Sequence, residues 1–112
     1  MKFGLFGGAT AKTAGHGAAP RSAAVGERLQ FSGSDDSHGY LQLIDGVTEA
    51  ERLGFHSIFL VEHHFTGAAQ ISASLNMLTF LAARTSRIRL GTAVVVVPWH
   101  NPVLLAEQAA TV

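Results

Sequence analysis

The sequence contains no cysteine, which excludes a disulfide framework and a thiolate metal site. Charge is sparse and balanced, with eight basic and eight acidic residues, so no basic face is available for a nucleic-acid backbone. The longest apolar run, residues 93–97, is far shorter than the roughly 20 residues that span a bilayer, and the first residues lack a signal-peptide pattern. We therefore expect a soluble cytoplasmic protein that binds neither nucleic acid nor membranes.

Apolar residues are abundant, at 47% of the 112 residues, and suffice for the core of one small domain. Seven of the twelve glycines fall between residues 7 and 39. So long a loop is uncommon in a compact domain, and we expect residues 7–39 to form a functional lid or a disordered segment. This loop completes no phosphate-binding motif, because Phe6, Ala11 and Pro20 stand where such motifs require glycine.

Hydrophobic periodicity predicts three strands that alternate with three helices. The continuously apolar stretch 91–97 indicates that the third strand is buried on both faces. Gly54 suits the end of the first helix, while Asn101 and Pro102 suit the start of the third. The expected strands span residues 2–6, 57–61 and 87–97, and the expected helices span residues 40–53, 74–84 and 103–112.

The strand–helix alternation predicts an α/β fold with parallel strands joined by right-handed crossovers. The third strand is the most apolar of the three, yet the sequence contains no fourth strand to pair with its free edge. A long, apolar, unpaired edge promotes association. We therefore expect the chain to be the front part of a larger, incomplete sheet.

The segment that follows the second strand carries the candidate chemistry. Glu62, His63 and His64 come directly after the apolar residues 57–61, at the carboxyl end of a strand, where parallel α/β folds place their active sites. Strand side chains alternate, so Glu62 and His64 should project to one side and His63 to the other. An imidazole that titrates near neutral pH suits proton transfer, which makes His63 the favoured catalytic residue.

Other roles for these residues stay open at this point. His63 could instead be a core histidine paired with Glu62, and His64 could line the site or support it from behind. We expect Glu62 to orient an imidazole or a backbone amide. Trp99 and His100 could line the site or pack at its rim. A metal site built from Glu62, His63, His64 and His100 is the weaker alternative, because adjacent strand residues point apart.

Four segments together resemble the bacterial luciferase-like flavin-dependent monooxygenases. They are residues 1–6, 60–65, 89–93 and 101–102, and the resemblance extends over the chain except for the loop 7–39. The resemblance implies a (β/α)8 TIM barrel, of which residues 1–112 would be the first three βα units of a single domain. The flavin phosphate would then be held by loops near later strands, which this sequence lacks, so we expect residues 1–112 alone to be inactive.

The resemblance also implies a reaction and its site. Reduced FMN, supplied by a separate flavin reductase, would react with oxygen to oxidise a small organic substrate. His63 would lie beside the flavin as the catalytic residue, and Ala93 and Val94 would contact the ring across a cis peptide bond. Phe6, His64 and Phe65 would line the substrate pocket.

Two alternatives to this activity remain. One is an oxidoreductase of the same superfamily that depends on coenzyme F420 and needs no oxygen. The other is a non-catalytic remnant that keeps the fold without the cofactor. In the full-length family form we expect a homo- or heterodimer.

Overall fold

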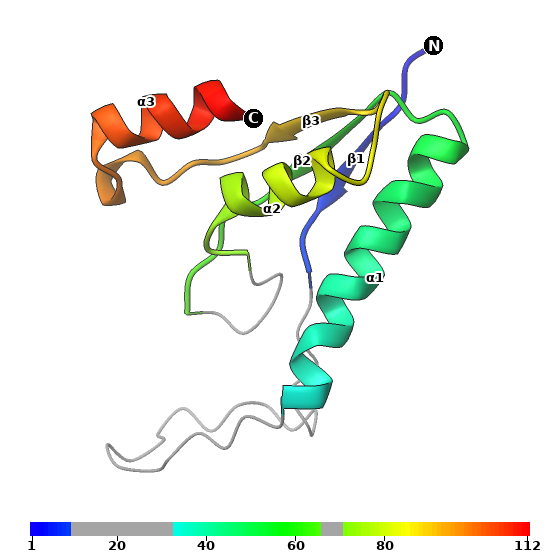
Figure 1. The fold of residues 1–112 in the computed structure, drawn as a ribbon, viewed down its shortest axis with the longest axis horizontal. Coiled ribbons are helices and arrows are strands. Elements are labelled where there is room, and N and C mark those ends of the chain that lie inside the picture. Colours follow the sequence, from blue (N-terminus) through cyan, green and yellow to red (C-terminus); the bar gives the residue numbers. More distant parts are fainter. Residues whose placement is uncertain (10–32, 66–70) are drawn as a thin grey trace.

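The computed structural model of the protein describes residues 1–9, 33–65 and 71–112. Strands and helices alternate along the chain, and the three strands form one parallel sheet in the order β1-β2-β3 (Figure 1). This is the predicted α/β arrangement, and it is compatible with part of a luciferase-like barrel. The elements are β1 (Gly4–Gly7), α1 (Gly33–Arg52), β2 (Ser57–Leu60), α2 (Ser74–Ala82), β3 (Arg89–Thr92), a 3₁₀ helix η1 (Val97–Trp99) and α3 (Pro102–Thr111).

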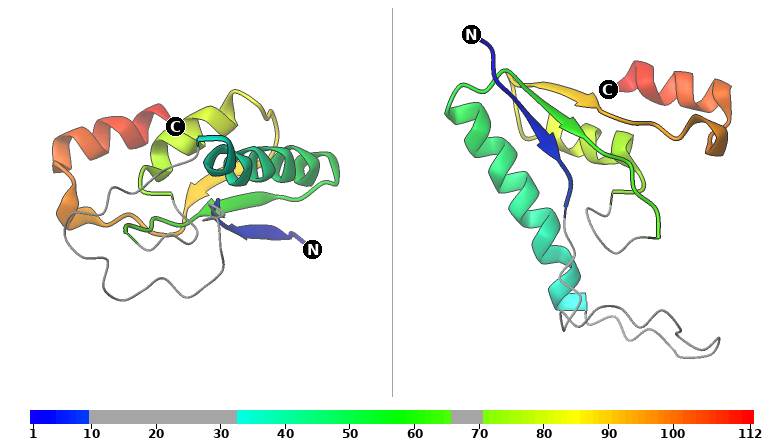
Figure 2. Two further views of the ribbon diagram at one scale, coloured as in Figure 1. Left: turned by 90° about the horizontal axis from the view of Figure 1, so that it is seen from below. Right: turned by 180° about the vertical axis from the view of Figure 1, so that it is seen from behind.

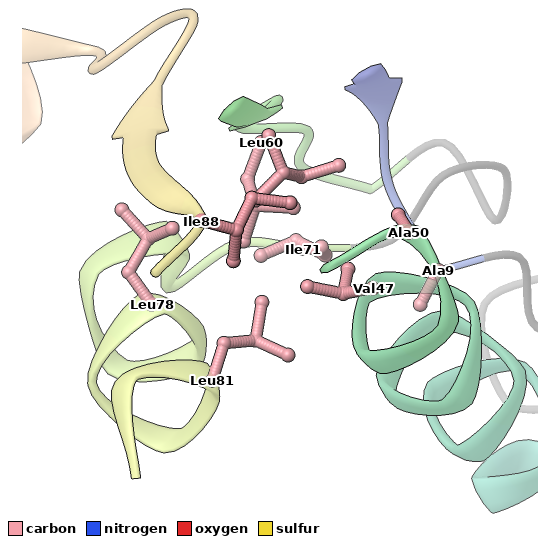
Figure 3. Packing of buried hydrophobic residues seen from close by; sticks show 9 residues of the cluster. Ala9, Val47, Ala50, Leu60, Ile71, Leu78, Leu81 and Ile88 are labelled. Carbon is pink, nitrogen blue, oxygen red and sulfur yellow. The ribbon is translucent and has the colours of Figure 1, made fainter. Parts of the chain in front are cut away.

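The helices cover one face of the sheet. In the left view of Figure 2, α1 and α2 lie on the same side of the three strands. The core lies between these two helices and the sheet, and Figure 3 shows how its side chains meet. Its largest fully buried members are Leu60 of β2, Val47 of α1, and Leu78 and Leu81 of α2. No described helix covers the other face, which we call the open face.

The first helix begins earlier than the sequence predicted. It starts at Gly33 rather than at Tyr40 and runs through Gly39 and Gly46. A glycine inside a helix costs only about 1 kcal/mol, so these residues do not end it. The expected loop 7–39 is therefore shorter than predicted, and its residues 10–32 lie outside the described part of the chain.

Gly54 ends the first helix, as the sequence predicted. Its φ angle is +85°, a conformation that glycine adopts without steric cost. The Gly54 N–H donates to the Glu51 carbonyl and the Phe55 N–H to the Ala50 carbonyl, which satisfies two carbonyls at the helix end. The chain then turns directly into β2.

The third strand is shorter and more exposed than the sequence predicted. It ends at Thr92, where the expected strand continued to Val97 and was buried on both faces. Thr92 is paired with Leu60, the last residue of β2, so the following residues have no neighbouring strand within the described structure. Val94 and Val97 are half exposed. The apolar run 91–97 is typical of a buried strand, but only a further strand paired with the free edge of β3 would extend and bury it.

A carboxylate that the sequence analysis did not single out fixes the start of β3. Glu51 Oε1, near the end of α1, accepts hydrogen bonds from three consecutive backbone N–H groups, those of Ser86, Arg87 and Ile88, at 2.8, 2.6 and 2.9 Å. These hydrogen bonds hold the pKa of Glu51 below its ordinary value.

None of the described helices combines the length and apolar character that crossing a membrane requires.

Candidate functional site

The candidate site lies at the carboxyl end of the sheet. Hydrogen bonds continue beyond the last residues of the strands, from the Val61 N–H to the Gly7 carbonyl and from the Ala93 N–H to the Leu60 carbonyl. The residues after β2 and those after β3 are therefore held at the same edge. Beyond this point His63 donates its backbone N–H to the Ile71 carbonyl at 3.0 Å.

The predicted alternation of Glu62, His63 and His64 is confirmed. Glu62 is buried and lies 2.8 Å from His64 Nε2, measured from its Oε1 atom, while the side chain of His63 is exposed. Adjacent residues in extended backbone project to opposite sides. The alternative in which Glu62 partners His63 is wrong, because the partner of this carboxylate is His64.

Glu62 has both carboxylate oxygens occupied, and its side chain is only 1% exposed. Its Oε1 accepts from His64 Nε2 and, at 3.4 Å, from His100 Nε2, while its Oε2 accepts from the Val96 N–H at 3.1 Å. Burial raises the pKa of Glu62, but the hydrogen bonds from His64, Val96 and His100 outweigh it, and the pKa lies below its ordinary value. The expected role of Glu62, orienting an imidazole or a backbone amide, is confirmed for both kinds of group.

The His64 ring is held on a second side by Trp99 of η1. The ring centroids lie 4.4 Å apart at 72°, an edge-to-face contact, and Phe65 flanks both rings at 6.0 and 6.2 Å. Phe65 itself is 95% exposed, with a φ of +59° that is uncommon for a bulky residue. His64, Trp99 and Phe65 therefore form an aromatic group at the end of the sheet.

The open face carries a row of aromatic and small residues. Phe6 of β1 is in register with Phe59 of β2, and Phe59 is in register with Gly91 of β3. A Cβ atom added at Gly91 would lie 2.9 Å from the Phe59 ring, so this ring occupies the space that a side chain would need. Phe6 is 72% and Phe59 44% exposed. His63 follows Phe59 by four residues, so strand alternation places it on the same face.

Phe59 and Gly91 are neighbours on this face that were not predicted from the sequence. The even spacing between Phe59 and His63 predicts that the two side chains share a face of the strand. Because the residues around Phe59 are apolar, the sequence instead favoured a position in the core. The signal for Gly91 depended on strand register, which the sequence did not reveal. The small Ala93 follows Gly91 by two residues and is exposed. The open face therefore presents exposed apolar groups, and strand alternation places the exposed His63 imidazole on the same face.

A cavity of about 270 Å³ lies on the opposite side, toward the helices. Its wall includes Glu62 and His100, and it extends along the start of α2 and the first turns of α3. Trp99, which the sequence left between site lining and rim packing, lines this cavity and contacts His64. Glu62 and His100 are the ionisable side chains at the wall of this cavity.

Two further expectations concern a metal and a cis bond. The described residues contain no group of three or more histidine, cysteine, aspartate or glutamate side chains that could hold a metal ion. No peptide bond among them is cis, so the Ala93–Val94 bond is trans here. A cis bond was predicted for the complete, flavin-bound barrel, and for that state it stays a prediction.

Comparison with known proteins matches the whole chain, residues 1–112, to the family described as luciferase-like monooxygenase. A luciferase-like monooxygenase of Escherichia coli K12 is 36% identical over 80 residues, which are 70% of this chain and 24% of that protein. Limonene 1,2-monooxygenase of Rhodococcus erythropolis is 42% identical over 67% of this chain and 19% of its own length. The alkanal monooxygenase beta chain of Photorhabdus laumondii is 34% identical over 56% of this chain and 20% of its own length. The matched part of the chain thus spans about a quarter or less of these relatives.

Proposed function

Because the chain belongs to the luciferase-like monooxygenase family, we propose that it forms one wall of the flavin site in an oxygen-dependent monooxygenase that oxidises a small organic molecule. The observation that carries this proposal is the position of His63. Its imidazole is exposed beyond the carboxyl end of β2, and strand alternation places it on the open face with Phe59. Catalytic groups of parallel α/β folds occupy this end of the sheet.

The open face suits a flat aromatic cofactor. Phe59 covers Gly91 and offers its half-exposed ring to a flat cofactor, and the exposed Ala93 beyond it adds only a methyl group, so an isoalloxazine ring can approach the backbone at Ala93. We assign His63, Ala93 and Val94 to the cofactor and Phe6 and Phe65 to the substrate pocket, while His64 contributes to this pocket by supporting Phe65 rather than by facing the open face. Reduced FMN, when bound, supplies the electrons that activate oxygen.

His63 serves as the proton carrier in this proposal. A neutral imidazole accepts a proton at one ring nitrogen, and an imidazolium returns it. The His63 side chain has no hydrogen-bond partner among the described residues, so it can face a bound ligand. His64 is anchored to Glu62 and Trp99 and cannot turn toward the open face without breaking those contacts.

The proposed reaction needs partners that the described residues do not supply. A separate flavin reductase would deliver the reduced FMN. The relatives named for limonene and for an alkanal act on small molecules of low polarity, and we propose a substrate of the same class. The exposed Phe6 and Phe65 side chains offer apolar contacts to such a substrate.

Oxygen uptake tests this function. The product of the complete reading frame that contains residues 1–112 is incubated with photoreduced FMN and, separately, with reduced coenzyme F420. Long-chain aldehydes and cyclic terpenes serve as trial substrates. Substrate-dependent oxygen uptake with FMN alone supports the proposal. Hydride transfer from F420 without oxygen uptake identifies the F420-dependent alternative, and no turnover with either cofactor identifies the non-catalytic one.

A further inference from the structure

One buried carboxylate joins two segments that are far apart in the sequence. Glu62 follows β2, whereas Val96 and His100 lie in the connection between β3 and α3, 34 and 38 residues later. Its Oε2 accepts a hydrogen bond from the Val96 N–H, and its Oε1 accepts hydrogen bonds from the imidazoles of His64 and His100. Because the side chain is 1% exposed, water cannot replace any of these donors without opening the structure.

The contacts form a closed circuit. Glu62 accepts a hydrogen bond from the Val96 N–H. Val96 is in turn linked to Trp99, because the Trp99 N–H donates to the Val96 carbonyl at 3.0 Å in the turn that contains η1. The Trp99 and His64 rings make an edge-to-face contact, and the hydrogen bond between His64 and Glu62 closes the circuit. No member of the circuit can shift alone, because each is held by two others.

We propose that Glu62 is a positioning residue that holds the His64 ring and the segment 93–96 as one unit. It thereby fixes the backbone conformation at Ala93 and Val94 from the side opposite the open face. Among the described residues, two hydrogen bonds join the segment 93–96 to the β2 side, one from the Ala93 N–H to the Leu60 carbonyl and one from the Val96 N–H to Glu62. The importance of this segment for a flavin rests on the proposed function, but the coupling itself does not.

Removing the donor alone gives the sharpest test. Val96 has a φ of −78°, within the range that proline imposes, so Val96→Pro deletes the N–H and leaves Glu62 unchanged. Val96→Ala is the matched control, because it shortens the same side chain and keeps the N–H. Glu62→Gln removes the charge with little change of shape. Glu49→Gln, at an exposed glutamate of α1 paired only with Arg52, controls for the loss of one acid.

The fluorescence emission of Trp99 provides a readout that needs no cofactor. Trp99 is the only tryptophan of the 112 residues, so the signal reports on this one site. We expect Val96→Pro and Glu62→Gln each to change its emission spectrum and to speed amide exchange at Ala93 at least about tenfold, as local opening becomes easier. Val96→Ala and Glu49→Gln should keep both signals at their wild-type values. Circular dichroism establishes that each variant is folded, and if Glu62→Gln unfolds, Val96→Pro decides alone.

The outcomes separate cleanly. If Val96→Pro leaves the Trp99 emission and the Ala93 exchange rate unchanged in a folded protein, the coupling does not exist and the proposal is overturned. If Val96→Ala disturbs both signals as strongly as Val96→Pro, the side chain rather than the N–H is responsible, and the proposal is equally overturned. Failure of the wild-type protein to bind reduced FMN would count against the proposed function and would leave these two measurements unaffected.

Discussion

His63 and His64 are adjacent in the sequence, but their imidazoles lie in different surroundings. His64 is hydrogen-bonded to a buried carboxylate and makes an edge-to-face contact with the Trp99 ring, while His63 is exposed on the open face. The first ring is held in one orientation and the second is available to a ligand. Strand alternation therefore divides two identical side chains into a support and a candidate proton carrier.

We predict that the full-length protein loses more activity with His63→Ala than with His64→Ala. Loss of a general acid or base costs typically a factor of 10² to 10⁴ in rate, and only His63 faces the proposed flavin side. The kcat for substrate oxidation, measured at saturating reduced FMN, tests this. His64→Ala should instead change the Trp99 emission, because it removes the edge contact. An equal or larger loss of kcat for His64→Ala would contradict the assignment.

At the scale of elements, side chains near helix ends set where the neighbouring segments begin. Glu51 near the end of α1 binds three backbone N–H groups ahead of β3, and Asn101 caps α3. The Asn101 Oδ1 atom accepts from the Val103 and Leu104 N–H groups at 3.0 and 3.2 Å. Both residues satisfy donors that no strand or helix partner reaches.

We predict that Glu51→Gln lowers the midpoint of thermal unfolding and flattens its dependence on acidic pH. The folded-state pKa of Glu51 is depressed, so its stabilisation is fully present above the unfolded-state value and is lost as the pH falls through the folded-state value. Thermal unfolding followed by circular dichroism between pH 3 and pH 7 measures this.

Glu49→Gln is the control for this prediction, since it removes an exposed acid two positions away on α1 that pairs only with Arg52. The two variants should therefore differ most above the unfolded-state pKa of a glutamate. Identical unfolding curves for both variants would show that the three hydrogen bonds to Glu51 add no stability.

We predict that Asn101→Ala destabilises the chain by about 1 kcal/mol, which is the typical loss for removing a capping side chain. Asn101→Asp keeps an acceptor oxygen and adds a charge that the helix N-terminus favours, so its stability should equal or exceed that of the wild type. Urea unfolding followed by circular dichroism measures both variants. Equal losses for alanine and aspartate would mean that the cap is not the cause.

At the scale of the molecule, much apolar surface stays uncovered. Among the described strands, β1 and β3 each pair on one side only, and α3 has no buried residue. Phe6, Trp99 and Val103 are 72%, 60% and 76% exposed. Unpaired strand edges and apolar patches of this kind favour association with another polypeptide surface.

We predict that the 112-residue polypeptide self-associates in a concentration-dependent way. Light scattering coupled to size exclusion, over a hundredfold dilution series, measures this. Replacing Val103 and Leu104 of α3 with lysine should shift the distribution toward the monomer, since both side chains are exposed and the core is untouched. A monodisperse monomer at every concentration would show that the exposed surface does not drive association.

The sequence by itself determined those features that depend on neighbouring residues. Hydrophobic periodicity predicted the order of strands and helices, and Gly54 and Asn101 predicted a helix end and a helix start. Alternation along β2 predicted that His63 would part from Glu62 and His64. These signals are local, because backbone conformation, caps and side-chain direction are set within a few residues.

Only the tertiary structure decided which distant residues meet. The early end of β3, the three donors to Glu51 and the bond between Glu62 and Val96 depend on strand register and on how the helices lie against the sheet. Their partners are 34 to 37 residues apart, and no local pattern marks one backbone N–H among many as the partner of a distant acid. The Glu62 carboxylate is buried, and a carboxylate is costly to bury without donors, so its burial requires the donors that the fold brings within reach.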